Sequence, residues 1–258
     1  MRLTLRIAAI TAGLIACTPF HYLALLITGR SAWPRRYLAW VGWSAGMRCQ
    51  IIGKPMSSNV LFVANHSSWL DIVLLASASG TAFVSKEEVA RWPLVGWLAR
   101  LNRTVFVARE QPRSVKGQAD ALRTALANGQ PVALFPEGTT DGGEEILPFR
   151  PSLLAALFPP LPRLRVQPVA IDYGAAATEI AWIGRESARA NAMRILSRSG
   201  ATPVMIHFLD PIDPVDFADR KALAIASRAA ILGALPAAGP DGTGGSRLDA
   251  SARGADRL

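Results

Sequence analysis

A histidine and an aspartate lie close together in the stretch "VANHSSWLD", Val63 to Asp71. An imidazole can take a proton from a hydroxyl group. A carboxylate that accepts a hydrogen bond from its second nitrogen fixes the tautomer and strengthens the base. A regular α-helix would turn Asp71 roughly 140° away from His66. The two side chains can therefore act together only if His66 lies outside the helix that contains Asp71.

The residues around this pair predict such an arrangement. Val60–Ala64 is apolar throughout and is typical of a buried strand, and Ser68 stands where the N-cap of a following helix would be. Ser68-x-x-Asp71 is a variant of the capping box, so Asp71 has a structural explanation as a cap. The same geometry leaves His66 on the preceding turn, facing the first turn of the helix. Cap and catalytic partner are compatible roles for Asp71.

A second polar turn follows an apolar run in "VALFPEGTTDGGEEILPFR". Pro136 cannot continue a central strand, so the strand must stop there. Gly138 permits a close backbone approach, and Thr139 and Thr140 supply hydroxyl donors. Such a turn suits a phosphate or another polar head group. The alternative interpretation is a plain glycine turn.

The remaining pattern predicts the fold class. The predicted strands are Val60–Ala64, Thr81–Val84, Thr104–Val107, Pro131–Phe135, Val166–Tyr173 and Pro203–Leu209, and helical patterns fall between several of them. Wholly apolar strands separated by helices indicate an α/β fold with a largely parallel central sheet flanked by helices. Ligands of such sheets bind at the carboxyl ends of the strands, where both polar turns are placed.

The N-terminal region predicts contact with a membrane. Ile7 to Ile27 carries no charged residue, and about 20 such residues can cross roughly 30 Å of hydrocarbon. Pro19 and His21 weaken a simple spanning helix, and a re-entrant or interfacial hairpin is the alternative. If the segment spans, the arginines that follow it place the rest of the chain in the cytoplasm, at the inner membrane.

Composition supports this interpretation. The net charge of +9 fits the phosphates of either nucleic acid or an anionic membrane surface. A hydrophobic content of 50% with 18% charged residues favours the membrane and argues against nucleic acid as a partner. We expect a membrane anchor with an interfacial helix over 1–52, a catalytic domain over 53–236 and a disordered Gly- and Ser-rich tail over 237–258.

One further motif suggests a different chemistry. "GWSAG", Gly42 to Gly46, matches the GxSxG elbow of serine hydrolases, which would make Ser44 a nucleophile. The elbow requires a strand before the serine and a long helix after it, and a Trp-rich stretch precedes it here. A chance match in an interfacial segment is the favoured explanation.

The paired motifs resemble those of the glycerolipid acyltransferase family, that of the 1-acyl-glycerol-3-phosphate acyltransferases. Asn65-His66-x-x-x-x-Asp71 and Phe135-Pro136-Glu137-Gly138-Thr139 carry the likeness, which extends over about residues 54 to 220. "TVFVAR", ending at Arg109, and "VQPVAIDY", ending at Tyr173, resemble two further blocks of the family.

The resemblance implies acyl transfer from acyl-CoA or acyl carrier protein (acyl-ACP) to the hydroxyl of 1-acyl-glycerol-3-phosphate, giving phosphatidic acid for phospholipid biosynthesis. His66 would be the base and Asp71 its orienting partner, with no metal and no bound cofactor. The residues implied in binding the acceptor head group are Lys86, Arg109, Glu137, Gly138, Thr139, Thr140 and Arg150.

The sequence departs from the family at the head-group motif. The family's third block often continues with an arginine after Thr139, and this chain has Thr140 there. The version "FPEGTT…LPFR", ending at Arg150, resembles members that act on lyso-ornithine lipid, a phosphorus-free acceptor. Lyso-ornithine lipid is therefore the alternative acceptor, and a non-catalytic lipid-binding protein on the same scaffold is a further hypothesis.

Overall fold

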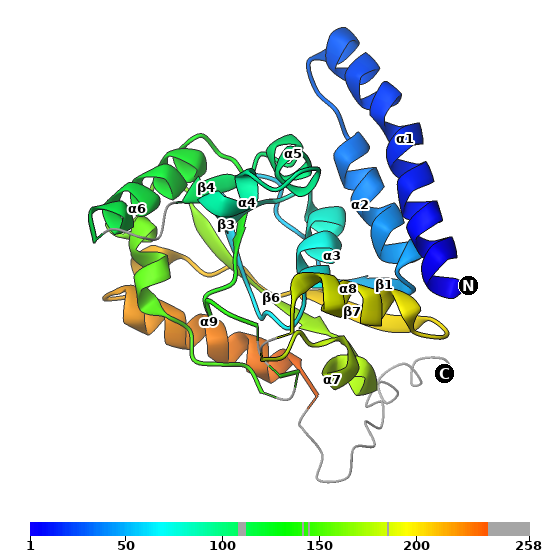
Figure 1. Ribbon diagram of the computed structural model, residues 1–258. Helices are drawn as coiled ribbons and strands as arrows, with labels where there is room; N and C mark the ends of the chain where they lie inside the picture. Colours follow the sequence, from blue (N-terminus) through cyan, green and yellow to red (C-terminus); the bar gives the residue numbers. More distant parts are fainter. Residues whose placement is uncertain (108–111, 141, 144, 185, 237–258) are drawn as a thin grey trace, which may run out of the picture.

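The computed structural model describes residues 1–107, 112–140, 142–143, 145–184 and 186–236 (Figure 1). A pair of N-terminal helices stands beside an α/β domain built on a seven-stranded sheet. The predicted fold class is confirmed. The tail predicted to be disordered, 237–258, lies outside the described residues.

The sheet has the order β1-β7-β6-β2-β5-β3-β4. Its strands are β1 (Met47–Ile52), β2 (Val60–Ala64), β3 (Ala82–Lys86), β4 (Val105–Val107), β5 (Val132–Leu134), β6 (Arg165–Asp172) and β7 (Thr202–Phe208). Among the paired strands of the described residues, only β6 and β7 run antiparallel. The parallel strands β2, β5, β3 and β4 therefore end at one edge of the sheet, which is where their polar turns gather.

Helices cover both faces of the sheet because its central strand is buried on both sides. All five residues of β2 are fully buried. Phe62 packs on one side with α3 (Trp69–Ser79), α7 (Ala177–Ile180) and α8 (Ala188–Ser197). Leu61 and Val63 pack on the other side with α6 (Pro112–Ala127), η1 (Pro151–Leu157) and α9 (Arg220–Ala234). The shorter helices are α4 (Glu87–Ala90), α5 (Val95–Leu101), η2 (Gly174–Ala176) and η3 (Pro214–Asp216).

The structure places residues 47–52 differently from the sequence analysis, which grouped them with the N-terminal segment. They form edge strand β1, which pairs with β7 from Met47 opposite Thr202 to Ile52 opposite His207. Four of the six residues of β1 are exposed, so the strand lacks the continuous apolar run that marks a buried one. The boundary expected at 52 thus falls after the first strand of the sheet.

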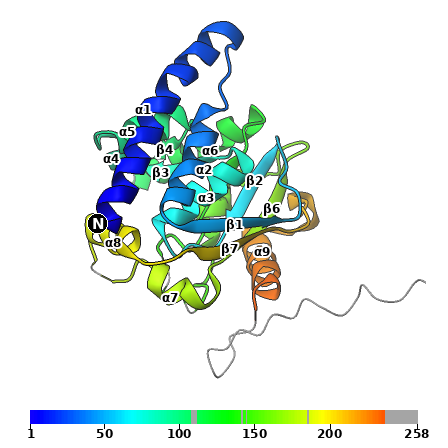
Figure 2. The same cartoon turned by 90° about the vertical axis from the view of Figure 1, so that its right-hand side faces the viewer.

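The two N-terminal helices form an antiparallel hairpin. Helix α1 (Arg2–Thr28) is long and apolar enough to cross a membrane, with a mean hydropathy of 1.8 over its most apolar window. It ends at Gly29, which adopts the left-handed conformation, and α2 (Trp33–Ser44) runs back alongside it (Figures 1 and 2). The Trp40 indole N–H donates to the carbonyl of Ala9 at 2.7 Å and ties the helices together.

Candidate active site

The His66 and Asp71 side chains meet at the carboxyl end of β2. Strand β2 ends at Ala64, and α3 begins only after Ser68, so His66 lies on the intervening turn. His66 Nδ1 is 2.9 Å from Asp71 Oδ2, and the side chains are 17% and 1% exposed. Because an ionised carboxylate only accepts hydrogen bonds, Nδ1 carries the proton and Nε2 is left as the basic nitrogen.

Asp71 is also the cap of α3. Its Oδ2 accepts from the backbone N–H groups of Ser67 at 2.7 Å and Ser68 at 2.8 Å, which completes a capping box. Its Oδ1 accepts from the Tyr173 hydroxyl at 2.6 Å. The geometry is therefore compatible with both interpretations of Asp71, since one carboxylate caps the helix and accepts a hydrogen bond from the imidazole. The sequence analysis did not single out the Tyr173 side chain, because β6 brings it from a distant part of the chain.

The Glu137 carboxylate binds the backbone of the turn that carries His66. Its side chain is buried, with the whole residue 1% exposed. Oε1 accepts from the backbone N–H of His66 at 2.8 Å, and Oε2 accepts from that of Leu147 at 2.9 Å. The sequence analysis expected Glu137 to contact the acceptor head group. In the structure its carboxylate accepts from the backbone of His66 and of Leu147, and the contact with His66 joins residues 71 apart, which no local pattern reveals.

The imidazole ring stacks on an aromatic side chain. The Phe135 ring lies 4.1 Å from the His66 ring, centroid to centroid, with an interplanar angle of 16°. Phe83 stacks behind Phe135 at 5.8 Å. The hydrogen bond to Asp71 and this stacking together restrict the rotation of the imidazole. The sequence analysis placed Phe135 at the end of a strand and in the second motif but assigned its ring no contact, although strand ends at this edge of the sheet are the expected place for one.

The second polar turn brings Gly138 and Arg150 together. Gly138 has φ +73°, and a Cβ added to it would lie 3.2 Å from Arg150 Cζ. A side chain at residue 138 would therefore push the exposed Arg150 guanidinium away. The backbone N–H of Arg150 also donates to the carbonyl of Pro136 at 2.8 Å. Arg150, which contacts this turn, and Thr139, which lies on it, are both exposed and can donate hydrogen bonds.

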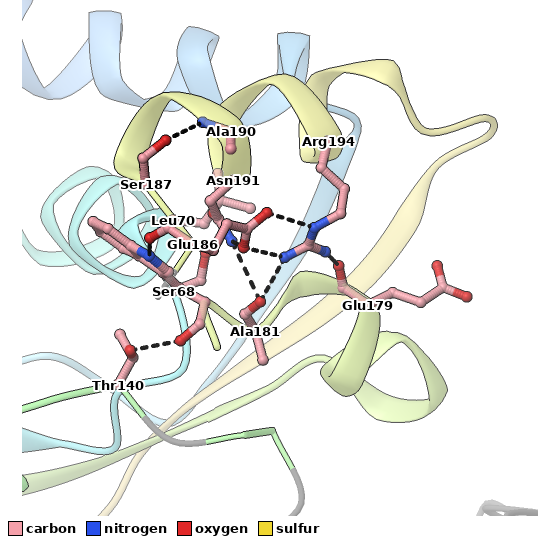
Figure 3. Close-up of polar contacts among 11 residues, drawn as sticks. Ser68, Leu70, Thr140, Glu179, Ala181, Glu186, Ser187, Ala190, Asn191 and Arg194 are labelled. Carbon is pink, nitrogen blue, oxygen red and sulfur yellow. Dashed lines mark hydrogen bonds and ion pairs between the residues drawn. The ribbon is translucent and has the colours of Figure 1, made fainter. Parts of the chain in front are cut away.

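Thr140 is used differently from the prediction. Its hydroxyl donates to the backbone carbonyl of Trp182 at 2.7 Å (Figure 3). A threonine hydroxyl has a single hydrogen to donate, so this contact uses the donor that the sequence analysis assigned to the head group.

The remaining predicted residues lie at the same edge of the sheet or outside the description. Lys86 ends β3, whose neighbour β5 leads into Phe135. Arg109 lies outside the described residues, and its expected contact with the acceptor stays a prediction. Among the side chains that the structure describes, no group of three His, Cys, Asp or Glu residues could hold a metal ion.

Ser44 does not lie on a nucleophile elbow. It is the last residue of α2 and precedes β1, the reverse of the strand, turn and helix order that the elbow requires. Ser44 is 6% exposed, and its hydroxyl has no hydrogen-bond partner within the described ranges. A buried hydroxyl without a base beside it is a poor nucleophile, which argues against the hydrolase hypothesis.

Comparisons with known proteins identify the family and the fold. An acyltransferase family model matches residues 48–172, from β1 to the end of β6. A structure of 1-acyl-sn-glycerophosphate acyltransferase from Thermotoga maritima shares the fold, with a TM-score of 0.60, 21% identity, and 90% of this chain and 96% of that chain covered.

Relatives with similar sequences include two types of lysolipid acyltransferase. Lyso-ornithine lipid O-acyltransferases of Rhodobacter capsulatus and Brucella abortus are 39% and 34% identical, over 72% and 87% of this chain and 69% and 90% of theirs. A 1-acyl-sn-glycerol-3-phosphate acyltransferase of Neisseria meningitidis is 31% identical over 67% of this chain and 69% of its own. The chain therefore belongs to the glycerolipid acyltransferase family and is an acyltransferase of lysolipids.

Proposed function

We propose that His66 is the general base of a direct acyl transfer from a thioester to a lysolipid hydroxyl. The 2.9 Å contact between His66 Nδ1 and Asp71 carries this proposal, because it leaves Nε2 free to accept the hydroxyl proton. The hydroxyl oxygen attacks the thioester carbonyl carbon as its proton passes to Nε2. The C–S bond then breaks, and the imidazolium returns the proton to the departing thiolate. Asp71 stabilises the imidazolium form between these steps.

The acyl donor in this proposal is acyl-CoA or acyl-ACP, used as a co-substrate. Both donors are acidic, CoA through its phosphates and the carrier protein through its surface, and the net charge of +9 favours their approach. The chemistry uses no metal and no resident cofactor, because His66 supplies the base and the thioester supplies the leaving group.

Lyso-ornithine lipid is the acceptor that we propose first. Its head group carries a carboxylate and an ammonium group but no phosphate. The relatives at 34–39% identity bear this activity in their names, while the Neisseria relative is at 31%. The planar Arg150 guanidinium beside Gly138 can pair with a carboxylate through two parallel hydrogen bonds. The missing arginine at residue 140 removes a natural phosphate ligand.

1-acyl-glycerol-3-phosphate stays the second candidate, because the paired HxxxxD and FPEGT motifs resemble those of the 1-acyl-glycerol-3-phosphate acyltransferases. Arg150 can pair with a phosphate as well as with a carboxylate. The backbone around Gly138 would approach a phosphate as closely as it would a carboxylate. Acylation of this acceptor would give phosphatidic acid.

An acceptor panel tests both assignments. Purified protein in lipid vesicles is supplied with lyso-ornithine lipid, 1-acyl-glycerol-3-phosphate or other lysophospholipids, each with acyl-CoA and with acyl-ACP. We expect acylated product, with the highest kcat/KM for lyso-ornithine lipid. A higher kcat/KM for 1-acyl-glycerol-3-phosphate would reverse the order of the two acceptors. No product from any pair would contradict acyl transfer and support the lipid-binding hypothesis.

The helix hairpin supports insertion into one face of the inner membrane, with the active site on the cytoplasmic side. The Arg6 side chain, near the start of α1, donates to the carbonyls of Ala45 at 2.9 Å and Gly200 at 3.0 Å. The N-terminus of α1 therefore lies on the side of the α/β domain, whereas a helix that crossed the bilayer would carry it to the opposite side. Leu26 and Ile27 are 84% and 72% exposed near the far end, and they would lie in lipid.

Labelling from one side of the membrane tests this orientation. In a protein whose Cys17 and Cys49 are replaced by serine, Thr4→Cys and Ser57→Cys, both at exposed positions, should both react with an impermeant maleimide from the cytoplasmic face. Both should be protected in vesicles of the opposite orientation. Labelling of the two positions from opposite faces would show that α1 spans the bilayer and would contradict the hairpin insertion.

Replacement of Ser44 separates acyl transfer from serine hydrolysis. We expect Ser44→Ala to keep the wild-type kcat, because direct transfer uses no serine nucleophile. The melting temperature should stay the same or rise slightly, since the change removes a buried hydroxyl without a partner in the described structure. Initial rates and thermal melting measure the two effects. Loss of turnover in a folded Ser44→Ala protein would support the hydrolase instead.

A further inference from the structure

The backbone of Trp182 connects the two polar turns of the active site. Its N–H donates to the carbonyl of Ser67 at 2.8 Å, and its carbonyl accepts from the Thr140 hydroxyl at 2.7 Å. Ser67 directly follows His66, and Thr140 follows the Gly138–Thr139 turn. Trp182 therefore contacts both the turn that carries His66 and the turn that is proposed to bind the head group. Trp182 lies beyond the residues that the family model matches, which end at 172.

The ion pair between Arg194 and Glu186 fixes the chain on both sides of Trp182. Arg194 of α8 donates from Nη2 to the carbonyl of Ala181 at 2.8 Å, and from Nε and Nη2 to the Glu186 carboxylate at 3.0 and 2.9 Å (Figure 3). Fully buried Asn191 donates to the same carboxylate at 2.8 Å. The Ala181–Trp182 peptide unit is thus held at its carbonyl by Arg194 and at its N–H by Ser67.

The Arg194–Glu186 pair stays charged over the pH range of any practical assay. Hydrogen bonds from the Arg194 guanidinium, and then from Asn191, lower the pKa of Glu186 to about 2. The indole N–H of Trp182 also donates to the backbone carbonyl of Glu186 at 2.7 Å. Trp182 is therefore tied to Glu186, and Ala181 and Glu186 are both held by Arg194 of α8.

We propose that Thr140, Trp182, Glu186 and Arg194, here named the Trp182 brace, set the distance between the base and the acceptor head group. This proposal rests on the proposed role of His66 as the base. Thr140 and Arg194 are positioning residues that act through the Trp182 backbone. The Thr140 hydroxyl donates its one hydrogen to the Trp182 carbonyl. That hydrogen is therefore not available to an anionic head group, which would accept from it.

The brace matters because the reacting atoms tolerate little displacement. The acceptor is held at the Gly138 turn, while its hydroxyl must reach His66 Nε2 within hydrogen-bond distance. A misplacement of about 1 Å can lower a rate by about 10²-fold without any change in binding. Loss of the brace should therefore lower kcat and leave KM nearly unchanged.

Two substitutions of Thr140 test this role. We expect Thr140→Val to lower kcat by about 10-fold, because the turns are no longer tied, and to leave the acceptor KM within about twofold. Thr140→Ser keeps the hydroxyl and should restore kcat. Thr124→Val is the matched control, since it removes a similar 2.8 Å hydrogen bond to a backbone carbonyl on α6, and it should behave as wild type.

The kinetic pattern distinguishes a brace from a head-group ligand. The kcat loss should be the same with lyso-ornithine lipid and with 1-acyl-glycerol-3-phosphate, as far as the wild type acylates each. A raised KM for one acceptor with an unchanged kcat would make Thr140 a ligand and overturn the proposal, as would an equal loss in Thr140→Ser. If 1-acyl-glycerol-3-phosphate proves to be the better acceptor, the same test of the brace is run with that acceptor and its expected outcome does not change.

Arg194 provides an independent test from outside the active site. Arg194→Gln should lower kcat at constant KM, because the Ala181 carbonyl and the Glu186 carboxylate both lose their charged partner. Arg198→Gln is the control, since Arg198 directly follows α8 and donates to the Glu179 carboxylate and the Thr202 hydroxyl rather than to Ala181 or Glu186. It should keep the wild-type kcat. Equal losses in the two folded variants would point to general destabilisation and overturn the proposal.

Discussion

His66→Ala is expected to lower kcat by about 10²–10⁴-fold, the usual contribution of a positioned general base. The substitution removes the only group that the mechanism uses to accept the hydroxyl proton. The KM for the lysolipid should change little, because the head group is proposed to bind at the Gly138 turn and not at His66. Initial rates of acylated product over a range of acceptor concentrations measure both constants.

A second histidine supplies the control for this substitution. His207 lies within β7, opposite Ala170 of β6, and takes no part in the polar turns. His207→Gln should therefore keep the wild-type kcat. A folded His66→Ala protein that retained full turnover would contradict the role of His66 as base. Thermal melting of both variants shows that the rates refer to folded protein.

Asp71→Asn should lower kcat by about 10²-fold or more and leave the protein folded. The amide can keep the cap, with its oxygen accepting from the N–H groups of Ser67 and Ser68 and its nitrogen donating to the Tyr173 oxygen. It cannot supply the negative charge that stabilises the imidazolium form of His66. Initial rates and melting temperatures measure the two effects separately.

Asp219 gives a matched control for the capping role. It caps α9 by accepting from the backbone N–H groups of Lys221 at 2.8 Å and Ala222 at 2.9 Å, and these hydrogen bonds lower its pKa. Asp219→Asn should cost some stability and leave kcat unchanged. If Asp71→Asn lost stability in the same way but kept its kcat, Asp71 would be a cap alone.

The sequence predicted the scaffold of the site because the scaffold depends on local patterns. The apolar run Val60–Ala64 is strand β2 with the same bounds, and Ser68 caps the next helix. The remaining five predicted strands agree with the observed ones to within two residues at each end. The edge strand β1 escaped notice because its exposed polar residues resemble the interfacial stretch before it.

Contacts between distant parts of the chain explain what the sequence did not predict. Glu137 reaches back to the backbone N–H of His66, and Trp182 joins Ser67 to Thr140. A carboxylate or hydroxyl in a polar turn resembles a ligand-binding group until its partner is known. The orientation of the hairpin likewise depends on Arg6 and its contact with Gly200, which is 194 residues away along the chain.

The intact mass of the protein after mixing with acyl-CoA alone tests direct transfer most directly. The account predicts an unchanged protein mass and an intact donor until lysolipid is added, after which wild type forms acylated lipid and His66→Ala forms very little. A protein mass increased by one acyl group before the acceptor is added, and lost when the acceptor arrives, would reveal an acyl-enzyme and contradict the account.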